Sequence, residues 1–518
     1  MTITSFFDRG RAINGRGDAF VMDGQRWSFD EAYGITCQVA HALVGLGLPK
    51  ETKVAVLSAN HPVSWMCVLG LWRAGFTWVP VNPRSSVTEQ QQLLHGFDVE
   101  VVFFQHYFAP MIEQLRGQCP QIRRLVCIDG SVPGCESLLD WIADRPQTPP
   151  AVMTEADDLA AVMPTGGTTG MPKGVMLTHR NLSVSVANSI INNHYESQEP
   201  IVNLAAAPMT HSAGFLSLPA SARGGTVVVV SKPDPVALLD AIEQHRVTEF
   251  FLPPTVIYRL LEIPGIQTRD FSSLRYFMYG AAPMSVEKLK QALTVFGPVM
   301  LQGYGQTEAP GGISAMRPSD HFVDGKVAPD ERLLSCGRPS VLNALAIMDE
   351  GANILPSGSS GEICIRGDIV MKGYYKQSDK TAETIIDGWL HTGDVGHLDA
   401  EGFLHITDRK RDMIISGGFN VYPSEVEQVL WTHHAVLDCA VIGVPDENWG
   451  EAVKAVVELK PQAQASVEEL IALCKEKLGS VKAPKSVDFV LTLPRSAVGK
   501  VLKKEIREPY WRDVERRI

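Results

Sequence analysis

Short apolar runs alternate with helical stretches along most of this chain, and this alternation limits its fold more than any other feature. From Asp18 to about Arg145, strand-like runs such as KVAVLSA and VEVVFFQ are separated by the helical stretches Phe29–Leu46 and Val63–Ala74. The alternation resumes after Ala160, where AAVMPTG, TVVVVS, TEFFLPPT and SLRYFMYG are strand-like. Strands that alternate with helices predict a parallel sheet covered by helices. We therefore expect one large α/β body up to about residue 400.

The pattern changes in the last third of the chain. Leu342–His405 consists of short strand-like runs and Gly-rich turns, which predict a small β subdomain or barrel at about residues 330–408. The charged run DRKRD at 408–412 then marks a boundary. Beyond it we expect a helix opened by Ser424 with Glu427 as its capping box, two strands and the helix Ser466–Leu478. The predicted architecture is a large N-terminal α/β domain with parallel-rich sheets (1–410) and a small α+β C-terminal domain (411–518).

Length and charge narrow the class of protein. With 518 residues, the chain exceeds the roughly 250–300 residues at which a single core stops growing, so two or more domains are expected. The net charge of −11 argues against a nucleic-acid-binding protein. The first residues contain no apolar signal region, and the longest apolar runs are too short for a membrane span. The nine cysteines form no CxxC pair and are expected to be reduced. Together, these features predict a cytoplasmic protein without stable membrane insertion.

A Gly/Thr-rich loop follows the apolar run that includes Val162. Its adjacent glycines, hydroxyls and nearby lysine can place backbone N–H groups, hydroxyls and an ammonium around phosphate groups. The loop differs from a Walker A motif, because Lys173 follows Pro172 and precedes Gly174. Its candidate phosphate-binding residues are Thr165, Gly166, Gly167, Thr168, Thr169, Gly170 and Lys173.

Six further motifs follow this loop in a characteristic order. They are YGAAP at 279–283, GYGQTE at 303–308, GWLHTGD at 388–394, DRKRD at 408–412, SGGFN at 416–420 and PRSAVGK at 494–500. Together with the loop they resemble the acyl-adenylate-forming enzymes, which include acyl-CoA synthetases, adenylation domains of peptide synthetases and luciferases. The resemblance covers nearly the whole chain. It implies an ATP-dependent carboxylic acid:CoA ligase of the acyl-CoA synthetase branch, which forms an acyl-AMP and then transfers the acyl group to CoA.

The resemblance implies a set of nucleotide-binding residues. Glu308 would bind a Mg²⁺ ion that bridges the ATP phosphates, with Thr168 as a second metal residue, and a hard cation suits such oxygen ligands. Thr307 would contact the α-phosphate. The other implied residues are Tyr304, Gly305, Gly280, Ala281 and Ala282 around adenine, Asp394 at the ribose hydroxyls, and Arg409 at ribose or phosphate.

The resemblance also implies how the chain catalyses its reaction. Lys500 matches the family's catalytic lysine, whose ammonium would stabilise negative charge as the substrate carboxylate attacks and pyrophosphate leaves. No basic nucleophile is needed, because a carboxylate is already ionised at neutral pH. His211 would lie near the acyl pocket. Arg411 would be a hinge for rotation of the C-terminal domain, after which Gly417 and Gly418 would line a pantetheine tunnel.

Two other interpretations stay open at this point. An adenylating enzyme that loads a carrier protein, or forms another amide or ester, would share these motifs, and a non-catalytic nucleotide-binding protein is the third interpretation. Small residues at Ala213, Gly214, Gly311 and Gly312 suggest a roomy pocket, so we expect a medium- or long-chain fatty acid or an aryl or alicyclic acid. The expected partners are this acid, ATP and CoA. A homodimer is one assembly that the sequence leaves open.

Overall fold

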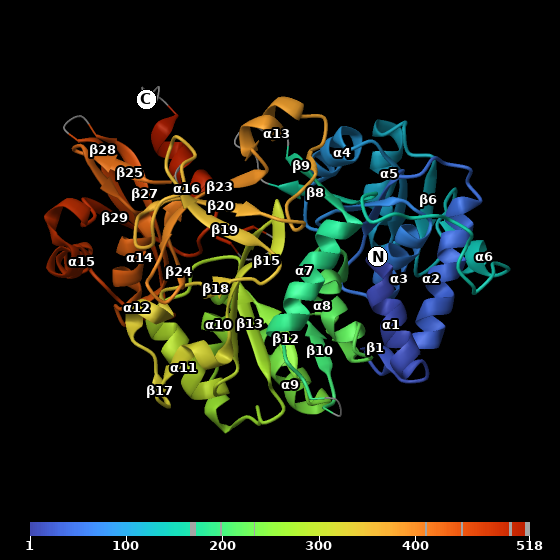
Figure 1. Cartoon of the computed structure of the whole chain (residues 1–518), viewed down its shortest axis with the longest axis horizontal. Coiled ribbons are helices and arrows are strands. Elements are labelled where there is room, and N and C mark those ends of the chain that lie inside the picture. The colour runs from blue at the N-terminus through green and yellow to red at the C-terminus, as the bar shows by residue number, and fades with distance from the viewer. Residues whose placement is uncertain are drawn as a thin grey trace.

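The strands of the described residues form two large sheets, two smaller sheets and one short hairpin (Figure 1). The computed structural model describes residues 1–165, 172–196, 199–232, 234–409, 412–446, 449–496 and 500–512. In this part of the chain, no helix is both long enough and apolar enough to cross a membrane. Both large sheets are mostly parallel, so the predicted α/β class with parallel-rich sheets is confirmed.

The first large sheet has nine strands, of which the six central ones are parallel. Helices α9 (Pro235–His245), α10 (Pro254–Leu261) and α11 (Val286–Phe296) pack on one of its faces. In spatial order its strands are β18 (Arg338–Pro339), β15 (Ala309–Met316), β14 (Met300–Gln306), β13 (Tyr276–Gly280), β12 (Glu249–Leu252), β10 (Val202–Ala205), β11 (Thr226–Val229), β1 (Asp18–Met22) and β2 (Gln25–Ser28).

The second large sheet has eight strands, of which six are parallel and two, β9 and β21, form an antiparallel edge. Helices α4 (Val87–Gly96) and α5 (Ala109–Gln118) pack on its outer face. In spatial order its strands are β21 (Gly373–Tyr374), β9 (Lys173–Thr178), β8 (Leu159–Thr165), β4 (Thr77–Pro80), β3 (Lys53–Leu57), β5 (Val99–Phe104), β6 (Arg124–Cys127) and β7 (Glu136–Ser137).

A layer of helices lies between the two large sheets and is shared by both. Along β3, Val54 and Val56 belong to the hydrophobic cluster of this layer, whereas Ala55 and Leu57 belong to the cluster under α4 and α5, as the two-residue period of a strand requires. The shared layer consists of α1 (Thr4–Asn14), α2 (Phe29–Val44), α3 (Pro62–Arg73), α7 (His179–Asn192) and α8 (Gly214–Ser221). Because one close-packed cluster contains side chains of both sheets, it fixes their relative position.

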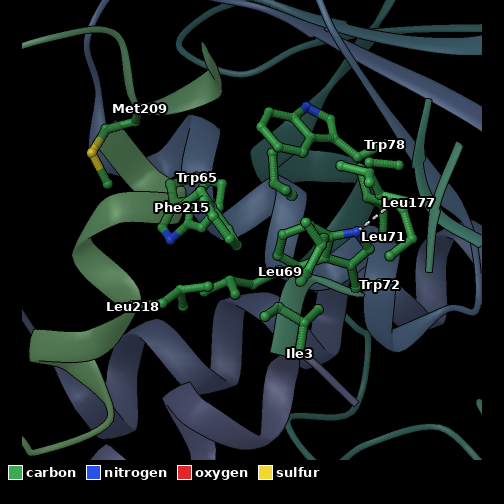
Figure 2. Packing of buried hydrophobic residues seen from close by; sticks show 14 of the residues in the cluster. Ile3, Trp65, Leu69, Leu71, Trp72, Trp78, Leu177, Met209, Phe215 and Leu218 are labelled. Carbon is green, nitrogen blue, oxygen red and sulfur yellow. Dashed lines mark hydrogen bonds between the residues drawn. The ribbon is translucent and has the colours of Figure 1, made fainter. Parts of the chain in front are cut away.

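Three tryptophans lie at the centre of the shared layer (Figure 2). Trp65 and Trp72 of α3 and Trp78 of β4 pack edge-to-face, with ring centroids 5.5 to 5.8 Å apart. The indole N–H of Trp72 donates a hydrogen bond to the carbonyl oxygen of Ala160 at 2.8 Å. A side chain at Gly214 would overlap the Trp65 ring, so the start of α8 packs directly on this cluster.

The two smaller sheets use the last third of the chain. The sheet predicted as the β subdomain is antiparallel and contains β19 (Ala344–Met348), β20 (Gly361–Arg366), β22 (Ile385–Ile386), β23 (Trp389–Leu398) and β24 (Leu404–Arg409). The last sheet, orange to red in Figure 1, contains β25 (Ile414–Ser416), β26 (Phe419–Val421), β27 (Val436–Asp446), β28 (Gly450–Leu459) and β29 (Ser486–Val490). It packs with α14 (Pro423–Trp431), α15 (Val467–Lys482) and α16 (Lys503–Trp511).

The predicted capping box at Ser424 is wrong. α14 begins with a proline, which suits a first helical position because its missing N–H would have no partner there. Ser424 therefore lies inside the first turn, and its N–H donates to Asp408 Oδ2 at 3.0 Å. The Glu427 carboxylate accepts a hydrogen bond from the backbone N–H of Val441 at 2.7 Å instead of returning to Ser424.

Replacing Trp65 tests the importance of the shared layer. We expect Trp65→Ala to lower the free energy of unfolding by about 3–5 kcal/mol, because it opens a cavity between two other rings. Urea unfolding followed by far-ultraviolet circular dichroism measures this change. The control is Tyr107→Ala, since Tyr107 is 83% exposed. A loss of unfolding free energy no larger than that of the control would contradict the central role of Trp65 in the shared layer.

Candidate active site

A cleft of about 2720 Å³ lies where β13 and β14 of the first sheet end. Ligands of parallel sheets commonly bind outside the carboxyl ends of their strands. The cleft is also lined by β23 and by the C-terminal segment that carries Lys500. The predicted site residues that line it are Thr165, Lys173, Gly280, Ala281, Ala282, Tyr304, Gly305, Thr307, Glu308, Asp394 and Lys500.

Two paired glycines lie at the end of β13 and on the neighbouring β14. Gly280 pairs with Gly303 across these two parallel strands. A Cβ atom at Gly280 would overlap the carbonyl oxygen of Gly303, so this close approach requires glycine. Ala281 follows with a positive φ of 66°. A flat ring can approach the backbone at such a place, which is the property predicted for the adenine-binding segment.

Tyr304 and Asp394 meet in the cleft although 90 residues separate them. The Tyr304 hydroxyl donates a hydrogen bond to Asp394 Oδ2 at 2.6 Å. Burial, and next the Asp394 carboxylate, raise the pKa of Tyr304 well above its ordinary value, so the phenol remains a donor. Asp394 is 5% exposed. The hydrogen bond therefore holds a nearly buried carboxylate in a fixed orientation.

Two charged side chains of the cleft, Glu308 and Lys173, contact Tyr374. Its hydroxyl donates to Glu308 Oε1 at 2.8 Å, and the Lys173 ammonium lies 4.8 Å from the centroid of the Tyr374 ring. Burial, and next the Glu308 carboxylate, raise the pKa of Tyr374, which keeps its hydroxyl protonated. One tyrosine thus contacts both a cation and a carboxylate that line the cleft. An ammonium and a carboxylate side by side suit a phosphate and its metal ion.

Several predicted residues cannot be placed. Gly166, Gly167, Thr168, Thr169, Gly170 and Arg411 lie outside the described residues, as do the side chains of His211 and Arg409. The backbone shows more. Thr165 and Lys173 pair across the antiparallel strands β8 and β9, so both ends of the predicted phosphate loop are next to each other. The backbone of His211 forms part of a π-helical turn, Met209–Ala213, directly before α8.

Gly417 and Gly418 lie away from the cleft. They form the turn between β25 and β26 with positive φ values of 57° and 82°, and neither is among the residues described as lining the cleft. A side chain at Gly417 would overlap the Trp449 ring. The two glycines and the cleft residues are therefore not brought together in this structure.

Lys500 lies on a short pair of extended segments. Ser496 N–H donates to the carbonyl oxygen of Lys500 at 2.8 Å, and Lys500 N–H donates to Ser496 Oγ at 3.2 Å. Leu502 N–H donates to the carbonyl oxygen of Pro494 at 2.9 Å. These bonds join the two segments and present Lys500 to the cleft.

Ion pairs fix both segments to the C-terminal sheet and its helix α14. Arg495 Nη2 donates to Asp438 Oδ2 at 2.8 Å and to Glu458 Oε2 at 3.2 Å, and both carboxylates are buried. Lys503 Nζ lies 2.7 Å from Glu427 Oε1. Burial acts to lower the pKa of Lys503, but the combined attraction of Glu427, Asp408 and Asp412 outweighs it and raises this pKa, so the lysine stays charged. The segments on either side of Lys500 are therefore held by ion pairs to three buried carboxylates.

Comparison with known proteins agrees with this geometry. Residues 9–375 match the family model of the AMP-binding enzymes, and residues 425–500 match the model of the AMP-binding enzyme C-terminal domain. The chain belongs to the AMP-binding enzyme family. The predicted resemblance, the predicted enzyme class and the acyl-CoA synthetase branch are confirmed.

Relatives of this AMP-binding enzyme include two CoA ligases. The medium/long-chain-fatty-acid–CoA ligase FadD8 of Mycobacterium tuberculosis is 35% identical over 496 residues, which cover 93% of this chain and 85% of that protein. Feruloyl-CoA synthase from Amycolatopsis sp is 36% identical over 489 residues, which cover 94% of each chain. Among solved structures, the amide bond synthetase McbA from Marinactinospora thermotolerans matches with a TM-score of 0.88 and 31% identity, over 98% of this chain and all of that one.

Three residues of the enzyme's site were missed in the sequence. Tyr374 stands in a two-residue strand without a motif of its own, and only its pairing with Val175 of β9 brings it to Lys173. Arg495 lies inside the PRSAVGK motif and Lys503 follows it, but neither charge can be told apart from that of an ordinary solvated residue by sequence alone. Buried acidic residues in other elements, which could have signalled them, become visible only in the fold.

Removing the Tyr304 hydroxyl tests the arrangement at Asp394. We expect Tyr304→Phe to weaken binding of Mg·ATP by about tenfold, because a hydrogen bond to a charged group contributes about 1.5–3 kcal/mol and the carboxylate loses its fixed orientation. Isothermal titration calorimetry measures the affinity, with the exposed Tyr107→Phe as control. An unchanged dissociation constant would remove Tyr304 from the account of this site.

Proposed function

We propose that this AMP-binding enzyme is an ATP-dependent carboxylic acid:CoA ligase that works through an acyl-AMP intermediate. The observation that carries this proposal is that Lys500 of the C-terminal part lines the same cleft as Lys173, Glu308 and Asp394. Two cations and two carboxylates then face one space in which a nucleotide and an acid can meet. The confirmed family and the two CoA-ligase relatives support the reaction class.

In the first half-reaction, an oxygen of the substrate carboxylate attacks the α-phosphorus of ATP, and the bond from this phosphorus to pyrophosphate breaks. The proposed roles follow from charge. Asp394 accepts hydrogen bonds from ribose hydroxyls, Lys173 and Thr307 contact phosphate oxygens, and the flat Gly280 segment receives adenine. Lys500 stabilises negative charge that develops between the carboxylate and the α-phosphate.

A magnesium ion fits the proposed site. Among the described residues, no group of three His, Cys, Asp or Glu side chains is placed to hold a metal ion by itself. Mg²⁺ usually keeps several waters and binds one or two carboxylates together with substrate phosphates, so a single carboxylate in a nucleotide cleft is a suitable partner. Glu308, held by Tyr374, would supply it, with Thr168 as the second predicted residue. When bound, the ion neutralises charge on the phosphates.

In the second half-reaction, the thiol sulfur of CoA attacks the acyl carbon, and AMP leaves. We propose that residues 411–518 act as a domain that rotates about Arg411, which withdraws Lys500 and brings Gly417 and Gly418 toward the acyl-AMP. Lys500 and the two glycines are separated in this structure, which supports the proposal. Lys500 lines the cleft, whereas the glycines form a turn elsewhere in the same part of the chain.

The proposed substrate is a medium- or long-chain fatty acid or an aryl or alicyclic acid. Phe215, Leu216, Phe251 and Met278 give part of the cleft an apolar wall. Gly311 lines the cleft as well and leaves room beside them. The relatives named for medium- or long-chain fatty acids and for ferulic acid support both kinds of acid.

Pyrophosphate release tests the proposed reaction. With Mg·ATP and a panel of fatty and aryl acids, we expect acid-dependent pyrophosphate release and, once CoA is added, an acyl-CoA thioester. Lys500→Ala is expected to lower acid-dependent release by about 10²–10³-fold, with Lys477→Ala as a control for an exposed lysine. Adenylate without thioester would instead indicate another acceptor, as the similarity to an amide bond synthetase allows. Absence of pyrophosphate release with every acid would contradict the proposal.

Replacing Lys503 tests whether its ion pair with Glu427 positions Lys500. We expect Lys503→Met to slow pyrophosphate release by about 10–100-fold, because a catalytic group displaced by about 1 Å loses much of its effect. Thioester formation from supplied acyl-AMP is expected to change much less, since Lys500 has left the cleft in that step. The control is Lys477→Met. Equal losses in both half-reactions would show a general structural defect instead of a loss of positioning.

A further inference from the structure

The apolar part of the cleft ends at a polar layer of the first large sheet. Side chains on one face of β13 recur every two residues, so Gly280, Met278 and Tyr276 share a face. Met278 pairs with Phe251 of β12, and Tyr276 pairs with Glu249. Each two-residue step spans about 6.6 Å, so the layer of Glu249 lies about 13 Å below the nucleotide end at Gly280. A substrate chain of that length would reach this layer.

Glu249 organises the polar layer. It is fully buried, and it accepts hydrogen bonds from Asn203 Nδ2 at 3.0 Å, Tyr195 Oη at 2.9 Å and Asn193 Nδ2 at 3.4 Å. The Arg223 guanidinium lies 5.3 Å from the centroid of the Tyr195 ring, whose hydroxyl donates to Glu249. A carboxylate only accepts hydrogen bonds, so it turns both amide nitrogens toward itself. The amide oxygen of each asparagine therefore faces away from this carboxylate.

A small cavity lies against this layer. It offers about 10 Å³ to the centre of a water-sized sphere, which is enough for about one water molecule or one substrate oxygen. Asn203 lines it, and Ser212, Leu216, Phe251 and Met278 line both this cavity and the large cleft. Asn193, which is 2% exposed, also lines the large cleft. The cavity therefore borders the apolar part of the cleft.

We propose that the acid substrate carries a hydroxyl group at the end remote from its carboxylate, and that Asn203 and Asn193, oriented by Glu249, receive this group. The inference rests on the proposed function and narrows its substrate to hydroxylated acids. An acid with an apolar end would place a methyl or ring edge against amide groups and form no hydrogen bond with them. A site built to bind a substrate hydroxyl discriminates strongly against the analogue that lacks it.

Matched pairs of acids test this inference in the wild-type enzyme. The pairs are 4-hydroxycinnamate with cinnamate and 8-hydroxyoctanoate with octanoate, each measured by pyrophosphate release. We expect kcat/KM to be at least about tenfold higher for the hydroxylated member of one pair. Equal values within both pairs would overturn the inference while leaving the ligase intact. Lack of release with all four acids and with every other acid of the panel would instead overturn the proposed function.

A substitution at Asn203 tests whether the polar layer causes the preference for the hydroxylated acid. Asn203→Leu is expected to reduce the ratio of kcat/KM between the two members of the pair to about one, because the number and branching of the side-chain heavy atoms are kept and the amide is lost. The exposed Gln291→Leu on α11 serves as the control and should leave the ratio unchanged. A ratio that survives Asn203→Leu would place hydroxyl recognition elsewhere and overturn the assignment. Should this variant fail to fold, the wild-type substrate pairs still decide the inference.

Discussion

The structure depends on one helix layer that is packed against both large sheets. Trp65, Trp72 and Trp78 fill its centre, and only the Trp72 indole N–H has a hydrogen bond there. Within the described residues the other two indole N–H groups are buried without a partner, which costs free energy. The close packing of three large rings must outweigh this cost. It fixes the sheets so that the ends of β8, β13 and β14 face one cleft.

Charged groups around the cleft come from elements far apart in the sequence, and each is held by a neighbour. Tyr304 orients Asp394, and Tyr374 contacts both Glu308 and Lys173. The C-terminal lysine is different, because the neighbouring Arg495 and Lys503 form ion pairs with carboxylates of the C-terminal sheet and of α14. In the proposed rotation, these ion pairs would move together with Lys500 and preserve its local geometry.

Much of this arrangement was predictable from the sequence, since strand and helix periods are local properties. The parallel sheets, the helices predicted at Phe29–Leu46 and Val63–Ala74 and the order of the motifs needed no knowledge of packing. The start of α14 was missed because Pro423 competes with Ser424 for the first position. Tyr374 could not be predicted, because only a long-range strand pairing gives it a partner. The loop 166–171 and Arg411 lie outside the described residues, so their predicted roles remain predictions.

The central claim is that a carboxylate oxygen attacks the α-phosphorus of ATP in this cleft, and an oxygen label tests it most directly. The enzyme would be supplied with an acid whose carboxylate carries ¹⁸O, together with Mg·ATP and CoA, and the products analysed by mass spectrometry. The account predicts one ¹⁸O atom in AMP, because the attacking oxygen stays on phosphorus when the thiol takes the acyl group. Unlabelled AMP, or label in pyrophosphate or inorganic phosphate, would contradict it.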